Sequence, residues 1–279
     1  MSENMTVLEK HEKFLYPVCR IYSEKAAGSG TIIYCEESPN EKGEYETFVL
    51  TNHHVIESCI TYGNEWDSLL KRKVEKEKFK IPHVEIFSYV RQSEVDSSNK
   101  FKAKIIAYDK GHDLAILKIE SPRKFDNVAH LIPEDEINDI KLFTEVVVGG
   151  CSLAHEPFCN FGQITFLKEI IEERRYFMTN CNSIFGNSGG ALFLKETGQL
   201  IGVPSRITAI QLGFSVDVMT WMGFAAHSER LYEFLKEQEL LFLFDGEDTF
   251  KDAMERRKNK EKESLMAMKA ELLKGDDKH

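Results

Sequence analysis

The chain has 279 residues, of which 42% are hydrophobic, so it is long enough to bury the core of one large β domain or two small ones. The 46 acidic residues outnumber the 36 basic ones, which gives a formal charge of −10 at pH 7. This balance argues against nucleic acid or an anionic membrane surface as the main partner. The first residues are polar and lack the pattern of a signal peptide, and no apolar run reaches the length of a membrane span. We therefore expect a cytoplasmic protein.

The cysteines give no support for a metal site. None of the six belongs to a Cys-x-x-Cys pair, which is the usual spacing of a structural zinc site. An even number of cysteines could form disulfides, but a chain without an export signal and with a full-size core more commonly carries reduced, buried thiols. We expect free thiols, no metal and no cofactor. The cysteines are Cys19, Cys35, Cys59, Cys151, Cys159 and Cys181.

In chain order, residues 1–16 mix apolar and charged side chains and predict a short helix or arm. Short apolar runs, several of them alternating, then predict strands in the first half of the chain at residues 18–22, 31–34, 47–51, 84–87 and 101–108. Small and polar residues predict turns at 27–30, 36–44 and 93–100. Residues 57–83 look like an insertion, because both charge signs alternate at helical spacing from 67 to 78. We interpret this insertion as a solvated helical face or a mobile loop.

The second half begins with a buried aliphatic run at 114–119. Further strands are predicted at 145–150, 162–166, 176–179, 191–194, 200–203 and 213–216. Many short strands separated by turns are typical of an all-β sandwich or barrel. From about Val218 the pattern becomes helical, with Met219 and Met222 included, and 250–273 predicts a charged amphipathic helix that ends at Gly275.

Three side chains stand at places where catalysis could occur. His54 follows an apolar strand, Asp113 directly precedes the buried aliphatic run, and Ser188 lies in a turn with glycines on both sides. A carboxylate beside a buried strand needs hydrogen-bond donors, and glycines let backbone N–H groups crowd around a nucleophile. Each signal is weak alone, since a lone histidine is more commonly a core or surface residue and glycine-serine turns are common. Together they appear in the order His, Asp, Ser, each on or beside a strand end.

The residues around these three side chains form recognisable blocks. Thr51-Asn52-His53-His54-Val55, Asp113-Leu114-Ala115-Ile116-Leu117 and Gly186-Asn187-Ser188-Gly189-Gly190 resemble the three signature blocks of trypsin-like serine proteases. The blocks are most similar to the high-temperature-requirement (HtrA/Deg) branch. The resemblance covers roughly residues 18–216, and it implies a mainly β fold of two antiparallel six-stranded β-barrels with the site between them.

The resemblance also implies an organisation in three parts. Residues 1–17 would be an N-terminal arm, 18–225 the protease domain and 226–279 a helical, charged C-terminal extension. That extension does not resemble the PDZ domain that usually follows the protease in the Deg branch. It could pack on the barrel, associate with another copy of the chain or contact a partner.

The same resemblance implies the catalytic roles. His54 would be the general base and Asp113 would hold the tautomer of its imidazole, while Ser188 would be the nucleophile. The backbone N–H groups of Gly186 and Ser188, with Asn187 between them, would form the oxyanion hole. His53 occupies a position that the family does not use catalytically.

The resemblance extends to the substrate groove. Ser205 falls where a hydroxyl commonly supports the aspartate, and Arg206 and Ile207 would line the groove with their main chain. Asn182 would form the base of the primary specificity pocket, with Ser183 beside it. No carboxylate lies there, and Ile207 stands where digestive relatives have glycine, so we expect a narrow pocket that favours small aliphatic side chains. Pro204 removes one main-chain donor from the groove strand.

These observations predict a serine endopeptidase that acts on a protein or peptide substrate and uses neither nucleic acid nor a membrane. Two other interpretations stay open. The chain could be a protease-fold interaction module in which the groove is closed, or a self-processing protease that cleaves its own chain or one partner.

Overall fold

The computed structural model describes residues 5–24, 26–39, 41–67, 71–212 and 214–276. The chain divides into two compact units, which are described separately. Unit 1 comprises Met1–Ile60 and Phe79–Tyr232, and unit 2 comprises Thr61–Lys78 and Glu233–His279. The predicted boundaries at residues 17 and 225 stay predictions.

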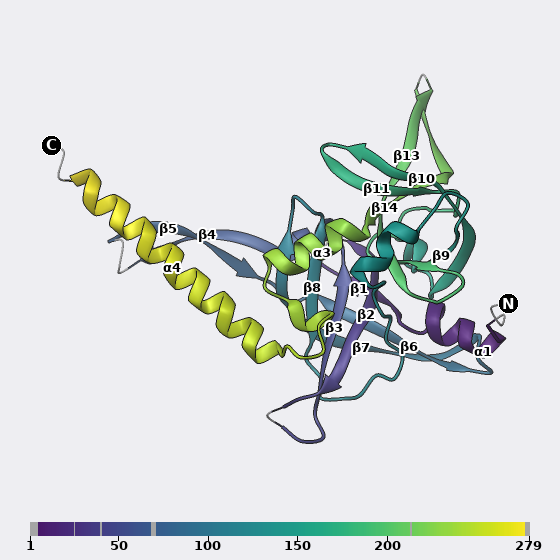
Figure 1. Ribbon diagram of the computed structural model, residues 1–279, viewed down its shortest axis with the longest axis horizontal. Helices are drawn as coiled ribbons and strands as arrows, with labels where there is room; N and C mark the ends of the chain where they lie inside the picture. Colours follow the sequence, from purple (N-terminus) through teal and green to yellow (C-terminus); the bar gives the residue numbers. More distant parts are fainter. Residues whose placement is uncertain (1–4, 25, 40, 68–70, 213, 277–279) are drawn as a thin grey trace. The chain divides into compact units, whose positions relative to one another are not determined.

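The first barrel of unit 1 is a closed antiparallel sheet with the strand order β1-β2-β3-β8-β7-β6 (Figure 1). Alternating and continuous apolar runs form these strands because a barrel buries one side of each strand. The bounds are β1 Val18–Tyr22, β2 Ala27–Glu37, β3 Tyr45–Thr51, β6 His83–Val90, β7 Glu94–Asp109 and β8 Leu114–Ile119.

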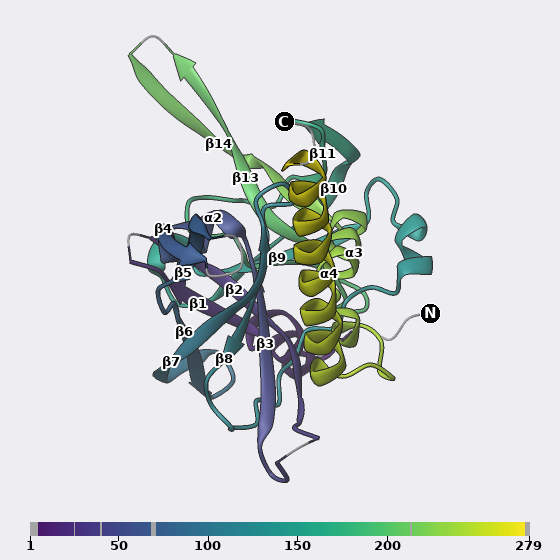
Figure 2. The same ribbon diagram turned by 90° about the vertical axis from the view of Figure 1, so that its left-hand side faces the viewer.

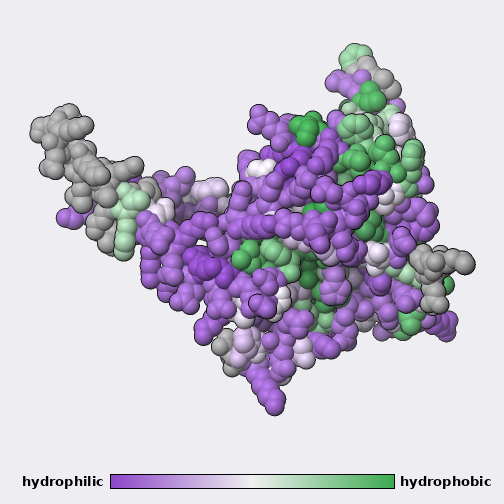
Figure 3. All heavy atoms as spheres, viewed as in Figure 1, coloured by the Kyte–Doolittle hydropathy of each residue, from purple (hydrophilic) through white to green (hydrophobic). Residues whose placement is uncertain are grey.

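The second barrel is closed in the order β10-β11-β14-β13-β12-β9, so the two predicted six-stranded barrels are confirmed. The bounds are β9 Glu145–Gly150, β10 Phe158–Ile171, β11 Arg174–Thr179, β12 Ala191–Leu194, β13 Leu200–Leu212 and β14 Ser215–His227. The strands β13 and β14 continue past their neighbours as a two-stranded ribbon that projects from the barrel (Figure 2). Its side chains are largely apolar (Figure 3).

Short helical segments connect these strands. The predicted N-terminal helix is present as α1 (Val7–Lys10) and one π-helical turn, η1 (His11–Leu15). Thr6 and Glu9 form a capping box at its start. The remaining segments of unit 1 are α2 (His53–Ile56), η2 (Glu57–Cys59), η3 (Glu134–Asp139) and η4 (Ser152–Ala154).

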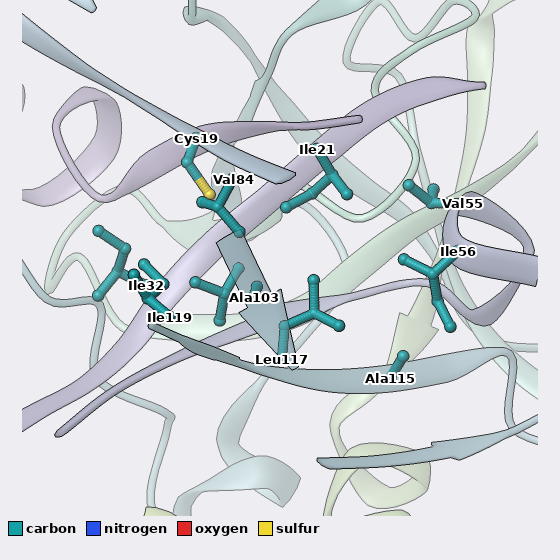
Figure 4. Close-up of a cluster of buried hydrophobic side chains, with 11 residues drawn as sticks. Cys19, Ile21, Ile32, Val55, Ile56, Val84, Ala103, Ala115, Leu117 and Ile119 are labelled. Carbon is teal, nitrogen blue, oxygen red and sulfur yellow. The ribbon is translucent and has the colours of Figure 1, made fainter. Parts of the chain in front are cut away.

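The core of the first barrel fixes the turn that carries His54. In Figure 4, Val55 and Ile56 of α2 lie at one end of a buried cluster that continues through Leu117 to Ile119. Each such side chain contributes about 1.5–3 kcal/mol when it is fully buried. Because His54 is followed directly by two buried residues, its backbone is anchored while its own side chain stays 42% exposed.

Two predicted turns are wrong, since residues 27–30 belong to β2 and 94–100 to β7. Gly30 serves close packing rather than a turn, because a Cβ there would lie 2.7 Å from Val49 Cγ1 and 2.8 Å from Ile21 Cδ1. The polar residues of 97–100 pair with residues 85–88 of β6, and a strand with one solvated face tolerates such a sequence.

The predicted helical start at Val218 is also wrong. Met219 and Met222 lie on β14, which continues to His227, and the helix α3 (Ser228–Glu237) follows. Met219 pairs with Thr208 across the ribbon. Apolar residues that fit a helical period also fit a paired strand when the run is short.

Unit 2 contains strands where the sequence predicted a helical face or loop. β4 (Ile60–Asp67) and β5 (Arg72–Phe79) form a two-stranded sheet. Lys78 and Glu65 form an ion pair of 3.0 Å across it. The prediction of a helical face or loop for 57–83 was therefore wrong. Its mixed charges fit the helical i,i+4 pattern and the cross-strand pattern equally well, so the sequence could not distinguish a helix from a strand pair.

The rest of unit 2 is helical, as predicted for the C-terminal region. η5 (Leu241–Leu243) follows α3, and α4 (Phe250–Asp276) contains the predicted charged helix. Thr249 accepts a hydrogen bond from the Asp252 N–H at 3.2 Å at the start of α4, and Arg256 binds Asp248 through two hydrogen bonds of 2.7 and 2.6 Å. No helix in the described part of the chain is long and apolar enough to cross a membrane.

One buried histidine makes stability depend on pH. His227 is 2% exposed, its ring stacks on Phe177 at 4.0 Å, and its Nδ1 accepts from the Glu229 N–H at 3.1 Å. Burial lowers its pKa from 6.5 to about 4. As the pH falls through 6.5, His227 therefore becomes protonated in the unfolded chain but stays neutral in the folded chain. The free energy of unfolding decreases as the pH is lowered.

We expect the free energy of unfolding to drop by about 1 kcal/mol between pH 7 and pH 5.5 from this group alone. Urea unfolding at both pH values measures it. His227→Asn keeps an acceptor for the Glu229 N–H but cannot titrate, so its pH dependence should be flatter even if its stability is lower. An equally steep pH dependence in this variant would contradict the assignment to His227.

Candidate active site

His54 and Asp113 form a directly hydrogen-bonded pair. The His54 Nδ1 lies 2.9 Å from Oδ2 and 3.0 Å from Oδ1 of Asp113, and the His54 backbone N–H donates to Oδ1 at 3.1 Å. The Ser205 hydroxyl donates to Oδ2 at 2.7 Å. The structure thus brings together three residues that the sequence singled out, His54, Asp113 and Ser205. Asp113 contacts the Nδ1 side of the imidazole, and the His54 side chain is partly exposed to solvent.

The backbone beside Asp113 is held by side chains. Asp113 has a φ of 56°, in the left-handed region that costs a non-glycine residue about 1–2 kcal/mol. Asn52 Nδ2 donates to the Asp113 carbonyl at 2.7 Å, and the His112 N–H donates to Asp109 Oδ1 at 2.5 Å. The buried guanidinium of Arg230 donates to the His112 carbonyl. These bonds fix a strained residue at the place where the carboxylate must point at His54.

Arg230 also joins the two barrels. Its Nη1 donates to the Arg175 carbonyl of β11 at 3.1 Å, and its guanidinium lies 4.6 Å from the centre of the Tyr176 ring. His112, which it also binds, belongs to the first barrel. Arg230 therefore ties the backbone beside Asp113 to the second barrel.

The ionisation of Asp113 suits an orienting role. Burial raises the pKa of this carboxyl, but the hydrogen bond and charge of His54 and the hydrogen bond from Ser205 outweigh it, so the net pKa lies below its ordinary value. The carboxylate is therefore ionised at neutral pH, and it can accept the His54 Nδ1–H.

The backbone of Ser188 contacts β2 of the first barrel close to Val55, the residue that follows His54. The Ser188 carbonyl accepts from the Ser29 N–H at 2.8 Å, and a Cβ built on Gly28 would touch both that carbonyl at 3.2 Å and Val55 at 2.8 Å. The Gly189 N–H donates to the Pro204 carbonyl at 3.0 Å, next to Ser205. Among the described residues no hydrogen bond joins the Ser188 hydroxyl to His54. Catalytic hydrogen bonds are commonly long without substrate, so the backbone bonds that hold the Ser188 turn to Ser29 and Pro204 are the informative observation.

The turn before Ser188 has its carbonyls fixed. The Phe185 carbonyl accepts from the Leu153 N–H at 2.8 Å, and the Gly186 carbonyl accepts from the Ser29 hydroxyl at 2.6 Å. Since N–H and C=O point in opposite directions across one peptide, the Gly186 N–H points away from Leu153. Gly186 has a φ of 97°, which favours glycine. Within the described chain, neither the Gly186 nor the Ser188 N–H donates to a protein group.

Asn187 supports this turn from inside. It is 3% exposed, its N–H donates to the Ile184 carbonyl at 3.2 Å, and its side-chain Oδ1 accepts from the Ser152 hydroxyl. The backbone N–H of Asn187 is thus used within the turn, whereas those of its two neighbours are not.

Two of the residues predicted for the specificity pocket, Ser183 and Ile207, adjoin Gly223. Ile207 pairs with Gly223, and a Cβ on Gly223 would lie 2.6 Å from the Ser183 hydroxyl. The Ser183 N–H donates to the Thr220 carbonyl at 2.7 Å. Asn182 precedes this point with an exposed side chain, and its carbonyl accepts from Asn160 Nδ2 at 2.9 Å. Arg206 pairs its guanidinium with Glu172.

Three contributing residues were not identified as functional from the sequence: Ser29, Asn52 and Arg230. Ser29 lies between two glycines, and a polar residue in a Gly-Ser-Gly run at a strand start is a weak signal that could have been followed. Asn52 was part of a signature block without a role of its own. Arg230 had no signal, because a sequence pattern does not show that an arginine on a helix is buried.

His53 and the cysteines lie outside the site. His53 is 6% exposed and stacks on Tyr108 at 5.3 Å, and burial lowers its pKa. The six cysteines form no disulfide in the structure, and burial raises the pKa of Cys151 to about 12. In the described part of the chain, no three His, Cys, Asp or Glu side chains are grouped so that they could hold a metal ion.

Two closed barrels, a hydrogen-bonded histidine–aspartate pair and a glycine-rich serine turn are the architecture of the two-barrel class of proteins. A family model described as "Trypsin-like peptidase domain" matches residues 28–203, and the chain therefore belongs to the trypsin-like peptidases. No match is found among curated proteins.

Solved structures share this fold. The HtrA-type protease AlgW with a tripeptide is 20% identical with a TM-score of 0.56, and the match covers 83% of this chain and 63% of that one. The serine endoprotease from Yersinia pestis is 19% identical with a TM-score of 0.53, and the match covers 84% of this chain and 67% of that one. This chain thus spans less than two thirds of AlgW, and the likeness describes the fold.

Proposed function

We propose that this endopeptidase hydrolyses peptide bonds in a protein or peptide substrate through Ser188, His54 and Asp113. The observation that carries the proposal is the Ser205–Asp113–His54 hydrogen-bond chain beside the Ser188 turn. His54 takes the Ser188 hydroxyl proton while Oγ attacks the scissile carbonyl, and it returns this proton to the leaving amine. Water then attacks the acyl-enzyme with His54 again as base, which releases the acid and restores the Ser188 hydroxyl.

The tetrahedral intermediate places its negative oxygen against the Gly186 and Ser188 N–H groups. Two observations support this assignment: the Phe185 and Gly186 carbonyls are held by other groups, and both N–H groups lack protein acceptors in the described chain. Preorganised donors of this kind each lower the barrier by roughly 3 to 4 kcal/mol.

We further propose a narrow primary pocket formed by Ser183, Ile207 and Asn182. Ile207 and Ser183 both adjoin Gly223, so the pocket has an aliphatic wall and a hydroxyl but no carboxylate. These side chains favour a small aliphatic residue before the cleaved bond. The tripeptide in the AlgW complex supports a peptide as the ligand of such a groove.

Six unpaired thiols support a reducing compartment such as the cytoplasm.

A fluorophosphonate probe tests the nucleophile directly, since it phosphonylates a serine that an adjacent base activates. We expect labelling of the wild type and none of Ser188→Ala, with intact-mass spectrometry placing the adduct on Ser188. Circular dichroism of both proteins shows whether they are folded. Absence of labelling in folded wild type would contradict the proposal and favour an interaction module. Fragments seen in purified wild type but absent from Ser188→Ala would show that the chain processes itself.

A further inference from the structure

The ribbon of β13 and β14 lies outside the barrel. β12 pairs with β13 only at Leu200 and Gly202, and β11 pairs with β14 only from Gly223 to Ala226. Beyond these points the two strands pair with each other alone, from Thr208 opposite Met219 to Leu212 opposite Ser215. The ribbon is defined here as residues 207–223.

The composition of the ribbon differs from that of the rest of the chain. In a protein with 29% charged residues, the ribbon has one, Asp217. Ile210 is 42% exposed, Val216 64% and Trp221 59%, and the side chain of Phe214 at the tip is fully exposed. Ile210 and Val216 lie on opposite faces of the ribbon, because they belong to neighbouring cross-strand pairs.

A bare ribbon of this kind is poorly stabilised by itself. A two-stranded hairpin is marginal in water, and an exposed apolar strand edge is a template for pairing with another chain. On the side of β13 away from β14, the described residues offer no strand partner to positions 206–210.

This open edge is continuous with the site. β13 carries Ser205, whose hydroxyl binds Asp113, and the next two residues are the proposed groove. The guanidinium of Arg206 is drawn towards Glu172 and lies over the Tyr176 ring at 5.6 Å. The same strand therefore leads from the catalytic carboxylate directly into the apolar ribbon.

We infer that the ribbon is a second recognition surface for the substrate, which binds an extended apolar segment on the amino-terminal side of the cleaved bond. This inference rests on the proposed function. A substrate strand that pairs with β13 rises about 3.3 Å per residue, as β13 does. The substrate therefore lies beside the ribbon from about the fourth residue before the cleaved bond and further towards the substrate's amino terminus. Backbone pairing supplies affinity, and the side chains of the ribbon select for apolar residues.

Three fluorogenic peptides with the same four residues before and two after the cleaved bond separate this inference from general binding. The short peptide ends there, the apolar long peptide adds five residues that alternate valine with serine, and the polar long peptide replaces each valine by aspartate. We expect kcat/KM about tenfold higher for the apolar long peptide than for the other two. In Ile210→Lys with Val216→Lys, the ratio of apolar long to short should fall to about one. The control, Ile81→Lys with Leu142→Lys, makes the same changes at exposed apolar positions elsewhere in unit 1 and should keep the wild-type ratio.

Binding of the labelled long peptides to Ser188→Ala, measured by fluorescence anisotropy, tests the ribbon without catalysis. Tighter binding of the apolar peptide, lost when Ile210→Lys and Val216→Lys are added, supports the inference. Equal binding of both long peptides overturns the inference. If sedimentation shows in addition that these substitutions dissociate a dimer, the ribbon binds another copy of the chain instead of the substrate. If the wild type neither cleaves the peptides nor reacts with the fluorophosphonate, the proposed function fails instead, and the anisotropy result still decides for or against the ribbon.

Discussion

Asp113→Asn is expected to lower kcat by about 10⁴-fold while the protein stays folded. The carboxylate accepts the Nδ1–H of His54 and the Ser205 hydroxyl, so it fixes the tautomer in which Nε2 of His54 is the base. An asparagine can turn its NH₂ towards Nδ1, which then must accept, and the proton moves to Nε2. The imidazole can no longer take the Ser188 proton, and the imidazolium loses its counter-charge.

The measurement is kcat and KM for the short peptide, together with the rate of fluorophosphonate labelling. Both rates should fall while KM changes little, because Asp113 contacts no substrate. Asp126→Asn removes the same charge from an exposed carboxylate, whose side chain is 76% exposed, and serves as the control. A loss of less than tenfold in Asp113→Asn would contradict the orienting role.

Gly189→Ala is expected to destabilise the protein by more than about 3 kcal/mol and to abolish labelling of Ser188. Gly189 has a φ of 85°, and an added Cβ would lie 2.2 Å from both the Ser29 carbonyl and the Thr51 hydroxyl, which are hydrogen bonded to each other. Neither group can withdraw, because both belong to buried strands of the first barrel.

Gly43→Ala is the matched control. Its φ is 83°, so the backbone cost of roughly 1–2 kcal/mol is the same, but nothing lies within 4 Å of the added Cβ. Urea unfolding of the two variants isolates the clash at Ser29 and Thr51 as the difference between them. Equal stabilities would show that the Ser188 turn does not press against the first barrel.

Strand alternation and turn residues are local signals, so they predicted an all-β sandwich or barrel, whereas the two six-stranded barrels were implied by the resemblance of the three blocks. The strand ends could not be predicted. Gly28 and Gly30 indicate a turn unless it is known that Gly30 packs against Ile21 and Val49. The 57–83 segment failed for a different reason: alternating lysine and glutamate supports a helix and a two-stranded sheet alike, and neither alternative buries enough apolar surface to decide.

The site was more predictable than the fold in one respect. His54, Asp113 and Ser205 lie in separate blocks, yet the order of the blocks and the resemblance predicted the contacts that the structure contains. The supporting contacts were not predictable, because Ser29 and Arg230 act through backbone carbonyls of residues that are distant in sequence. Such contacts depend on how two barrels meet, which no local pattern encodes.

The position of Ser29 has a consequence for how activity is lost. This residue of the first barrel makes three bonds to the second: its N–H to the Ser188 carbonyl, its hydroxyl to the Gly186 carbonyl, and its oxygen from the Cys151 N–H at 2.7 Å. A slight parting of the barrels breaks all three at once, although each barrel keeps its own strands. Hydrolysis would then stop before any strand unfolds. The rate of turnover therefore depends on the contact between the two barrels rather than on the folding of either barrel.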